Sequence, residues 1–183
     1  IDLIEMEAIV YDDTTLGAQF HKEPIPSNML ARAQEYRERL IEALADQDDR
    51  VLELYKEAHI DVVVVLNSIE EHLRYTEREL LPLYEQAGIQ VIYDPVPDFT
   101  APPQGTWDGS LQKVEMLVRQ GKYVAIHCHA GVGRTGIFAA CMAQDLLGLS
   151  PESAIEWVRR FIPFAVETQF QQQYVFGYRQ HKN

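Results

Sequence analysis

The clearest hydrophobic pattern in this chain is an apolar run over residues 60–66, in which valine and other β-branched residues fill nearly every position. Such a run is typical of a strand whose two faces are both covered, as in an α/β sheet. Shorter apolar runs of strand type occupy residues 89–93 and 123–128. Each of them lies just after a glycine, Gly88 or Gly121, that ends a helical pattern. We therefore expect these three runs to be strands of one short sheet.

Helical patterns occupy most of the chain around these strands. Apolar residues recur there every three to four positions, which places them on one face of a helix. The helices predicted in this way cover residues 51–58, 77–87, 107–120, 133–147 and 168–179, with one more between the last two. That additional helix is expected to begin at Pro151, directly behind the capping residue Ser150.

The first 26 residues show no regular period. Residues 1–11 are compatible with an edge strand or an extended arm, and residues 12–15 have the composition of a turn. Ser27 or Asn28 is expected to cap the helix that follows. One face of that helix is predicted to be buried, through Met29, Ala33, Tyr36, Leu40 and Leu44.

The alternation of strands and helices predicts an α/β fold, with a short, mainly parallel central sheet and helices on both faces. A length of 183 residues suits one domain with a core of useful size. No internal repeat, low-complexity tract or linker divides the sequence. We therefore interpret residues 1–183 as a single domain, with an N-terminal extension and helix over residues 1–45 and a core over residues 50–180.

Composition narrows the classes of partner. The formal net charge is −12, from 16 Lys plus Arg against 28 Asp plus Glu, which argues against binding to nucleic acid. An anionic ligand therefore needs a pocket that is locally positive. No apolar run approaches the roughly 18–20 residues that cross a bilayer, so no membrane partner is expected.

The cysteines and histidines are few. Cys128 and Cys141 are too few for a disulfide framework, which favours a reducing, cytoplasmic location. Cys128 stands between His127 and His129, but no second Cys/His cluster completes a zinc site. We expect no metal and no other cofactor.

The most unusual chemistry lies in residues 124–136, Val-Ala-Ile-His-Cys-His-Ala-Gly-Val-Gly-Arg-Thr-Gly. Cys128 ends a strand, and a helix begins about five residues later. Gly131 and Gly133 allow backbone N–H groups to turn inward, and the helix N-terminus adds partial positive charge. Arg134 supplies a planar fork for two phosphate oxygens. The same positive field favours the thiolate of Cys128, so the loop can bind a phosphate and direct a nucleophile at it.

Three other interpretations of this loop are weaker. The glycine spacing from residue 131 matches the dinucleotide-binding fingerprint, but that fingerprint requires a second strand with an acidic end about 20 positions later. Here a capped helix follows instead, from Ser150 onwards. A nucleotide-binding phosphate loop is excluded because no Gly-Lys-Ser/Thr follows. An inert buried cysteine suits Cys141 on its apolar helix, but not Cys128 among glycines and an arginine.

The sequence His-Cys-His-Ala-Gly-Val-Gly-Arg-Thr-Gly resembles the signature of the cysteine-dependent protein tyrosine phosphatase superfamily. The resemblance covers roughly residues 50–180 and is strongest to the atypical small dual-specificity type, which implies a tyrosine phosphatase-like fold. It implies that Cys128 is the nucleophile, Arg134 the phosphate clamp and Thr135 a hydrogen-bond donor to the sulfur. His127 would orient the loop. The implied phosphate cradle consists of His129, Ala130, Gly131, Val132, Gly133 and Arg134.

Phosphate transfer to sulfur also needs a proton for the leaving oxygen, and Asp98 and Asp94 are the candidates. Asp98 lies in a proline-rich loop that reads Val-Pro-Asp-Phe, 30 positions before Cys128. Small phosphatases of the superfamily carry a similar Pro-Asp-Phe loop at about this distance. Asp94 precedes Pro95 and is better explained as a turn residue. We predict that Asp98 is the general acid.

Residues 162–171 resemble the family segment that faces the pocket before the last helix. Gln171 matches a position that, in large tyrosine-specific members, holds a glutamine that positions the attacking water. Glu167 stands where a second such glutamine would be, and many small members have Glu-Thr there. The alternative for Glu167 is a carboxylate in the first turn of a helix, where the helix dipole favours it.

Together these features predict a metal-independent hydrolase of phosphate monoesters that forms a phosphocysteine intermediate. The resemblance implies phosphotyrosine on proteins or peptides as substrate, with phosphoserine and phosphothreonine as further candidates. Two alternatives stay open. An inositol phosphate or phosphoinositide substrate is disfavoured because lipid-directed relatives often carry lysines in the loop, and this loop has none. A non-catalytic phosphopeptide-binding module would normally have lost the cysteine, the arginine or the acid. The sequence leaves the oligomeric state open.

Overall fold

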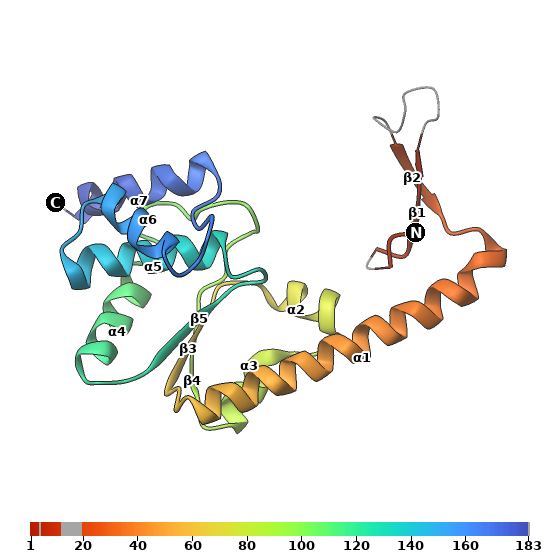
Figure 1. Ribbon diagram of the computed structural model, residues 1–183, viewed down its shortest axis with the longest axis horizontal. Coiled ribbons are helices and arrows are strands. Elements are labelled where there is room, and N and C mark those ends of the chain that lie inside the picture. The colour runs from red at the N-terminus through yellow and green to blue at the C-terminus, as the bar shows by residue number, and fades with distance from the viewer. Residues whose placement is uncertain (4, 12–19, 183) are drawn as a thin grey trace. The chain divides into compact units, whose positions relative to one another are not determined.

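The computed structural model describes residues 1–3, 5–11 and 20–182. Contacts between residues divide the chain into two compact units (Figure 1). The first consists of Ile1–Val51 with His72–Arg78, and the second of Leu52–Glu71 with Glu79–Asn183. The prediction of a single domain over residues 1–183, with an N-terminal extension over residues 1–45 and a core over residues 50–180, stays a prediction.

The first unit contains an antiparallel hairpin of β1 (Glu7–Tyr11) and β2 (Phe20–Pro24). Its register pairs Glu7 with Pro24 and Tyr11 with Phe20. Strand β1 lies within residues 1–11, for which an edge strand or an extended arm was predicted. The turn predicted at residues 12–15 lies outside the described residues.

Helix α1 (Ser27–Glu57) begins where the sequence predicts but is much longer than expected. The predicted break between residues 44 and 51 is wrong, because residues 45–50, an alanine followed by five polar residues, include no glycine or proline and are compatible with a helix. The predicted buried face is also only partly correct. Ala33 is buried, whereas Met29 and Tyr36 are 45% and 44% exposed. The side chains of Leu40 and Leu44 lie outside those described.

The second unit is built on a three-stranded parallel sheet with the order β4-β3-β5. These strands are β3 (Val62–Val65), β4 (Gln90–Tyr93) and β5 (Val124–His127). Every residue of β3 is buried, as its apolar run predicts for a central strand covered on both sides. All three strands point the same way, so their carboxyl ends meet at one edge of the sheet.

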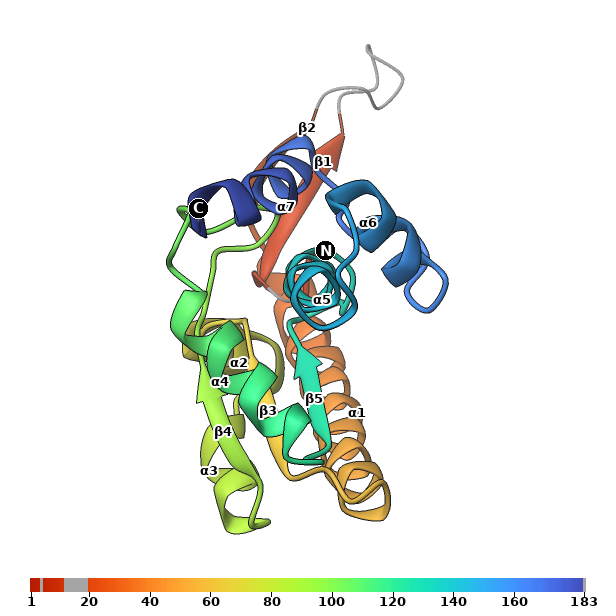
Figure 2. The ribbon, with the colours of Figure 1, turned by 90° about the vertical axis from the view of Figure 1, so that its left-hand side faces the viewer.

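Helices cover both faces of this sheet, which confirms the predicted fold class (Figure 2). On one face, Val63 and Val65 pack with Tyr84 of α3 (Leu80–Gln86) and with Tyr55 near the end of α1. On the other face lie α4, α5, α6 and α7. Their bounds are Asp108–Arg119, Gly133–Leu147, Pro151–Arg159 and Gln169–Lys182.

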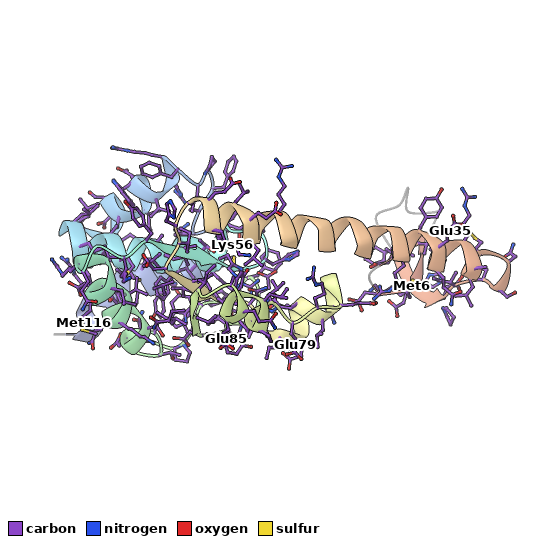
Figure 3. All side chains as sticks on the ribbon, turned by 90° about the horizontal axis from the view of Figure 1, so that it is seen from below. Met6, Glu35, Lys56, Glu79, Glu85 and Met116 are labelled. Atoms are coloured by element: carbon purple, nitrogen blue, oxygen red, sulfur yellow. The ribbon has the colours of Figure 1, made fainter. Side chains whose placement is uncertain are left out.

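The core on the second face is centred on Trp107, which is fully buried. Its ring meets Phe138 of α5 and Tyr174 of α7 edge-on, at 5.4 and 5.7 Å between ring centroids. Figure 3 shows side chains filling the space among these elements, with Glu85 of α3 and Met116 of α4 on the surface. The start of α6 agrees with the sequence, because the Ser150 hydroxyl caps it by accepting a hydrogen bond from the Ser153 N–H at 3.2 Å.

Two boundaries before β4 differ from the sequence prediction. Helix α3 begins at Leu80 rather than at residue 77, because Glu77 adopts a left-handed backbone with φ of 54° that interrupts the helix. A short helix that was not predicted, α2 (Ile69–Thr76), directly precedes it. None of the described helices combines the length and the apolar character that crossing a membrane requires.

Candidate active site

The strand–loop–helix turn from β5 to α5 forms the predicted phosphate loop. Gly131 has φ of 73°, a left-handed conformation that other residues rarely adopt. In the described part of the chain, no side chain caps the start of α5, and its first turn contains no acidic residue. The backbone N–H groups of this turn therefore remain available for an anion.

Cys128 lies at the base of this loop and is 7% exposed. Thr135, in the first turn of α5, donates a hydrogen bond from Oγ1 to Cys128 Sγ at 3.2 Å. A hydrogen bond of this kind stabilises negative charge on the sulfur. Cys141, farther along α5, is fully buried, and both cysteines are free.

Arg134 is almost completely buried, at 1% exposed, and points its guanidinium to the carboxyl edge of the sheet. Its Nη1 and Nη2 donate to the two carboxylate oxygens of Glu71, each at 2.9 Å. Nη1 also donates to the Val96 carbonyl at 2.9 Å, and Nη2 lies 3.1 Å from Asp98 Oδ1. Arg134 Nε is buried and has no hydrogen-bond partner among the described residues. The Nε–H group can therefore donate a hydrogen bond to an oxygen of a bound anion.

Glu71 was not predicted as a site residue, although it holds the arginine in place. Burial alone would lower the pKa of Arg134, but the hydrogen bonds and negative charge of Glu71, with the charge of Asp98, raise it overall. Burial alone would raise the pKa of Glu71, but the hydrogen bonds from Arg134 and the Ser68 N–H lower it overall. Each residue therefore stabilises the charged form of the other.

A local signal for Glu71 is present in the sequence. Ser68 and Glu71 form a capping box at the start of α2: Ser68 N–H donates to Glu71 Oε2 at 2.9 Å, and Glu71 N–H donates to Ser68 Oγ at 3.2 Å. The Ser-x-x-Glu spacing predicts this helix start. It does not predict the contact with Arg134, which is 63 positions away.

The proline-rich loop brings Asp98 to the site. Val96 anchors this loop, because its N–H donates to the Leu66 carbonyl at 3.0 Å while its carbonyl accepts from Arg134. The Asp98 side chain is 45% exposed, and its Oδ1 also accepts from the Phe99 N–H at 2.9 Å. A half-exposed carboxyl next to the phosphate clamp is suitably placed for proton transfer to a bound ester.

Asp94, the other carboxyl considered as an acid, has a different environment. Its Oδ2 accepts a hydrogen bond of 2.6 Å from Ser110 Oγ, and its backbone carbonyl accepts from Trp107 Nε1 at 3.2 Å. Burial raises the pKa of Asp94, and the Ser110 hydrogen bond opposes this. These contacts join the start of the proline-rich loop to α4. Asp94 itself lies at the end of β4 and not in a turn, because its N–H donates to the Val65 carbonyl of the neighbouring strand at 3.0 Å.

Gln171 and Glu167 both lie against the phosphate loop. A Cβ added to Gly133 would lie 2.6 Å from Gln171 Nε2 and 2.7 Å from Glu167 Oε2. Gln171 is fully buried, and its Oε1 accepts hydrogen bonds from the N–H groups of Glu167 and Thr168 at 2.8 and 3.2 Å. Its Nε2 donates to the Thr100 carbonyl at 3.4 Å, so this side chain bridges α7 and the loop of Asp98.

His127 connects the catalytic strand to the helices on the other face. Its Nε2 lies 3.1 Å from the Tyr84 hydroxyl, and its Nδ1 lies 3.1 Å from the Cys128 carbonyl. Burial lowers the pKa of His127, with a further contribution from the charge of Arg134. The neutral ring can orient the backbone at Cys128, the role that the resemblance implies. Tyr84, which stacks on Tyr55, is a second supporting residue that was not predicted.

The remaining residues of the predicted phosphate cradle differ in their exposure to solvent. His129 and Ala130 are exposed, Gly131 and Val132 are half-buried, and Gly133 is buried. In the described part of the chain, no group of three or more His, Cys, Asp or Glu side chains is arranged to hold a metal ion.

A cysteine beneath a glycine-rich loop, with a buried arginine and an aspartate beside it, is the arrangement expected of a cysteine-dependent phosphatase. Residues 37–145 match the family model described as "Polymorphic toxin system, DSP-PTPase phosphatase". This match covers more than half of the chain. The chain belongs to this family, and so to the dual-specificity and tyrosine phosphatase superfamily.

Solved structures agree with this assignment. The chain is 39% identical to Tk-PTP in a glycine-to-alanine mutant form, with a TM-score of 0.63, and the similarity covers 71% of this chain and 84% of Tk-PTP. The kinase associated phosphatase, solved with its catalytic-site cysteine replaced by serine, is 27% identical with a TM-score of 0.66. That similarity covers 70% of this chain and 74% of the other.

A third similarity involves a much larger protein. Over 109 residues the chain is 34% identical to elongation factor G of Ehrlichia chaffeensis. The matching stretch is 56% of this chain but 16% of the elongation factor. The chain therefore spans about one sixth of the length of the curated relatives it matches, and the similarity gives no information on activity.

Proposed function

We propose that this phosphatase hydrolyses phosphotyrosine on proteins or peptides, with phosphoserine and phosphothreonine as secondary substrates, through a phosphocysteine intermediate on Cys128. Two observations on the loop that leads into α5 carry this proposal. Cys128 Sγ accepts a hydrogen bond from Thr135, and the buried Nε of Arg134 has no hydrogen-bond partner among the described residues. A phosphate held by that donor and by the loop N–H groups would lie within reach of the sulfur.

In the first step, the thiolate of Cys128 attacks phosphorus opposite the ester oxygen, forming the P–S bond while the P–O bond breaks. The electron pair goes to the leaving oxygen, which takes a proton from the acid form of Asp98. Arg134 and the loop N–H groups stabilise the charge on the other phosphate oxygens. The dephosphorylated residue then leaves.

In the second step, water attacks the phosphocysteine. The carboxylate of Asp98 takes a proton from the water, and the P–S bond breaks with return of the electron pair to sulfur. The Thr135 hydrogen bond stabilises the departing thiolate. Inorganic phosphate leaves, and the enzyme returns to its initial state. In this proposal Gln171 and Glu167, which border Gly133, position the water.

The loop composition supports a protein substrate over a phosphoinositide. Its variable residues, His129, Ala130 and Val132, include no lysine, and the net charge of −12 opposes approach to an anionic lipid surface. The test is phosphate release from a matched panel of phosphotyrosine peptide, phosphothreonine peptide and soluble inositol phosphates. We expect the highest kcat/KM for phosphotyrosine. A higher value for an inositol phosphate would reject this substrate assignment.

A further inference from the structure

The segment between α6 and α7 carries a phenylalanine in an unusual backbone conformation. Phe164 has φ of 66°, in the left-handed region that bulky residues avoid, and its side chain is 83% exposed. An exposed ring gains no burial within the chain that would offset this strain. Backbone strain of this kind is retained at functional sites, so a strained and exposed aromatic side chain suggests a functional contact.

Phe164 borders an open hollow of about 580 Å³, which is lined by Arg159, Pro163, Phe164 and Glu167. Arg159 supports its wall, donating from Nε to the Ala165 carbonyl at 2.9 Å and from Nη2 to the Val166 carbonyl at 3.3 Å. Ala165 and Val166 are themselves fully buried. The exposed ring therefore stands on a segment that is anchored on its inner side.

The hollow adjoins the phosphate loop through Glu167. The Oε2 atom of Glu167 lies 2.7 Å from the place of a Cβ on Gly133, and the same residue lines the hollow. Glu167 therefore borders both the hollow and the loop that we propose binds the phosphate. We expect a residue next to the phosphorylated residue of a peptide to reach Phe164 from there.

We propose that this hollow is a specificity subsite, in which Phe164 and Pro163 bind an apolar side chain adjacent to the phosphorylated residue of a peptide. This inference rests on the proposed function. One cation, Arg159, and one anion, Glu167, line the hollow, so its lining charges balance and do not select a charged side chain. The apolar ring of Phe164 and the ring of Pro163 remain as the binding surface. The acidic character of the chain favours a peptide over an anionic bilayer as the occupant.

The test compares two phosphotyrosine peptides that differ only in the residues flanking the phosphotyrosine, leucine in one and serine in the other. We expect the wild-type protein to have a higher kcat/KM for the leucine peptide, by roughly tenfold, as one apolar contact commonly provides. In Phe164→Gly this preference falls towards one. Glycine suits the left-handed backbone, so the variant is expected to fold. Phe164→Leu, which keeps an apolar side chain, retains part of the preference.

Tyr123→Ser is the matched control, because Tyr123 is another exposed aromatic residue, 64% exposed, at the opposite end of the sheet from Cys128. It should keep the full leucine preference. An unchanged preference in Phe164→Gly overturns the subsite. A selective loss of activity on phosphoinositide vesicles in that variant also overturns it, in favour of a membrane contact. A wild-type protein inactive on both peptides and on para-nitrophenyl phosphate rejects the proposed function itself.

Discussion

Arg134 combines several tasks in one buried side chain. It is held by two hydrogen bonds to Glu71 and one to the Val96 carbonyl, which leaves Nε for a substrate oxygen and Nη2 in contact with Asp98. A buried guanidinium without its carboxylate partner is costly. The position of the phosphate clamp therefore depends on a glutamate that lies outside the signature loop.

Glu71→Gln should reduce both stability and activity. Loss of the charge leaves Arg134 with weaker partners, which we expect to cost about 1–3 kcal/mol of the free energy of unfolding. Misplacement of the guanidinium should lower kcat/KM for para-nitrophenyl phosphate by roughly ten- to a hundredfold. Denaturant unfolding and steady-state kinetics measure the two effects. Glu70→Gln, the exposed neighbour, is the control, and equal effects in the two variants would contradict the role of Glu71.

The same pair predicts a dependence of stability on pH. The folded state lowers the pKa of Glu71 below the ordinary value of 4.5, through Arg134 and the cap at Ser68. A lowered carboxyl pKa contributes stability above the unfolded value, and this is lost as pH falls through the folded value. We expect unfolding midpoints to fall on acidification below about pH 4.5, and less steeply in Glu71→Gln. Parallel curves for the two proteins would exclude Glu71 as a contributor.

Asp98→Asn tests the general acid. The change keeps the shape of the side chain but removes the proton, so kcat should fall by about 10²–10⁴-fold. A loss below about tenfold would place the acid elsewhere, and Asp94, the other candidate in the sequence, is then the next carboxyl to test.

Residue identities at the signature loop were predictable because their chemistry is local in sequence. Cys128, Thr135 and Arg134 lie within one turn, and the hydrogen bond from Thr135 to sulfur agrees with the predicted contact. Glu71 could not be assigned from sequence, because its partner is 63 positions away. The catalytic roles of the six residues stay predictions, although all of them lie at the site: Cys128, Arg134, Thr135, Asp98, Glu167 and Gln171.

At the scale of elements, strands were predicted more reliably than the short helices. The continuous β-branched run of β3 is typical of a strand that is buried on both faces. Helix α2, by contrast, has only 8 residues and a weak helical period of apolar positions. Its capping box was the available signal. The sequence prediction took the charged stretch between residues 44 and 51 as a break in the helix. That stretch contains no glycine or proline, so α1 continues through it.

Helix α5 depends on two glycines with different neighbours. A Cβ on Gly136 would lie 2.8 Å from the backbone N of Val166 and 2.9 Å from Ala165 Cβ. Neither of these two atoms can move away unless the backbone of Ala165 and Val166 moves with it. A Cβ on Gly133 would instead meet the ends of the Gln171 and Glu167 side chains. The first glycine thus maintains packing, and the second leaves room for site residues.

Gly136→Ala should destabilise the fold by about 1–3 kcal/mol, as overpacking does. Gly133→Ala should cost less stability but lower kcat/KM, because it displaces site side chains. Gly109→Ala on α4 is the control, since nothing lies within 4 Å of its added Cβ, and it should leave stability unchanged or raise it by up to about 1 kcal/mol. Thermal unfolding with parallel kinetics separates these cases. Equal stability of all three variants would contradict the packing described for α5.

For the whole molecule, the site belongs to the second compact unit, whose sheet places three loops at one edge. The phosphate loop follows β5, the acid loop follows β4, and Glu71 lies shortly after β3. Parallel strands bring their carboxyl ends together, so a fold predicted from hydrophobic pattern also predicted where the loops converge. The long α1 and the division into two units depend on contacts that a local pattern does not contain.

The central claim is that phosphate passes through the sulfur of Cys128. The most direct measurement is rapid acid quench of the wild-type protein during turnover of a phosphotyrosine peptide, followed by mass spectrometric mapping of the modified residue. We predict phosphate on Cys128, and neither phosphoenzyme nor turnover in Cys128→Ser, which should still bind inorganic phosphate. Phosphate on another residue, or turnover by Cys128→Ser at the wild-type rate, would contradict the mechanism.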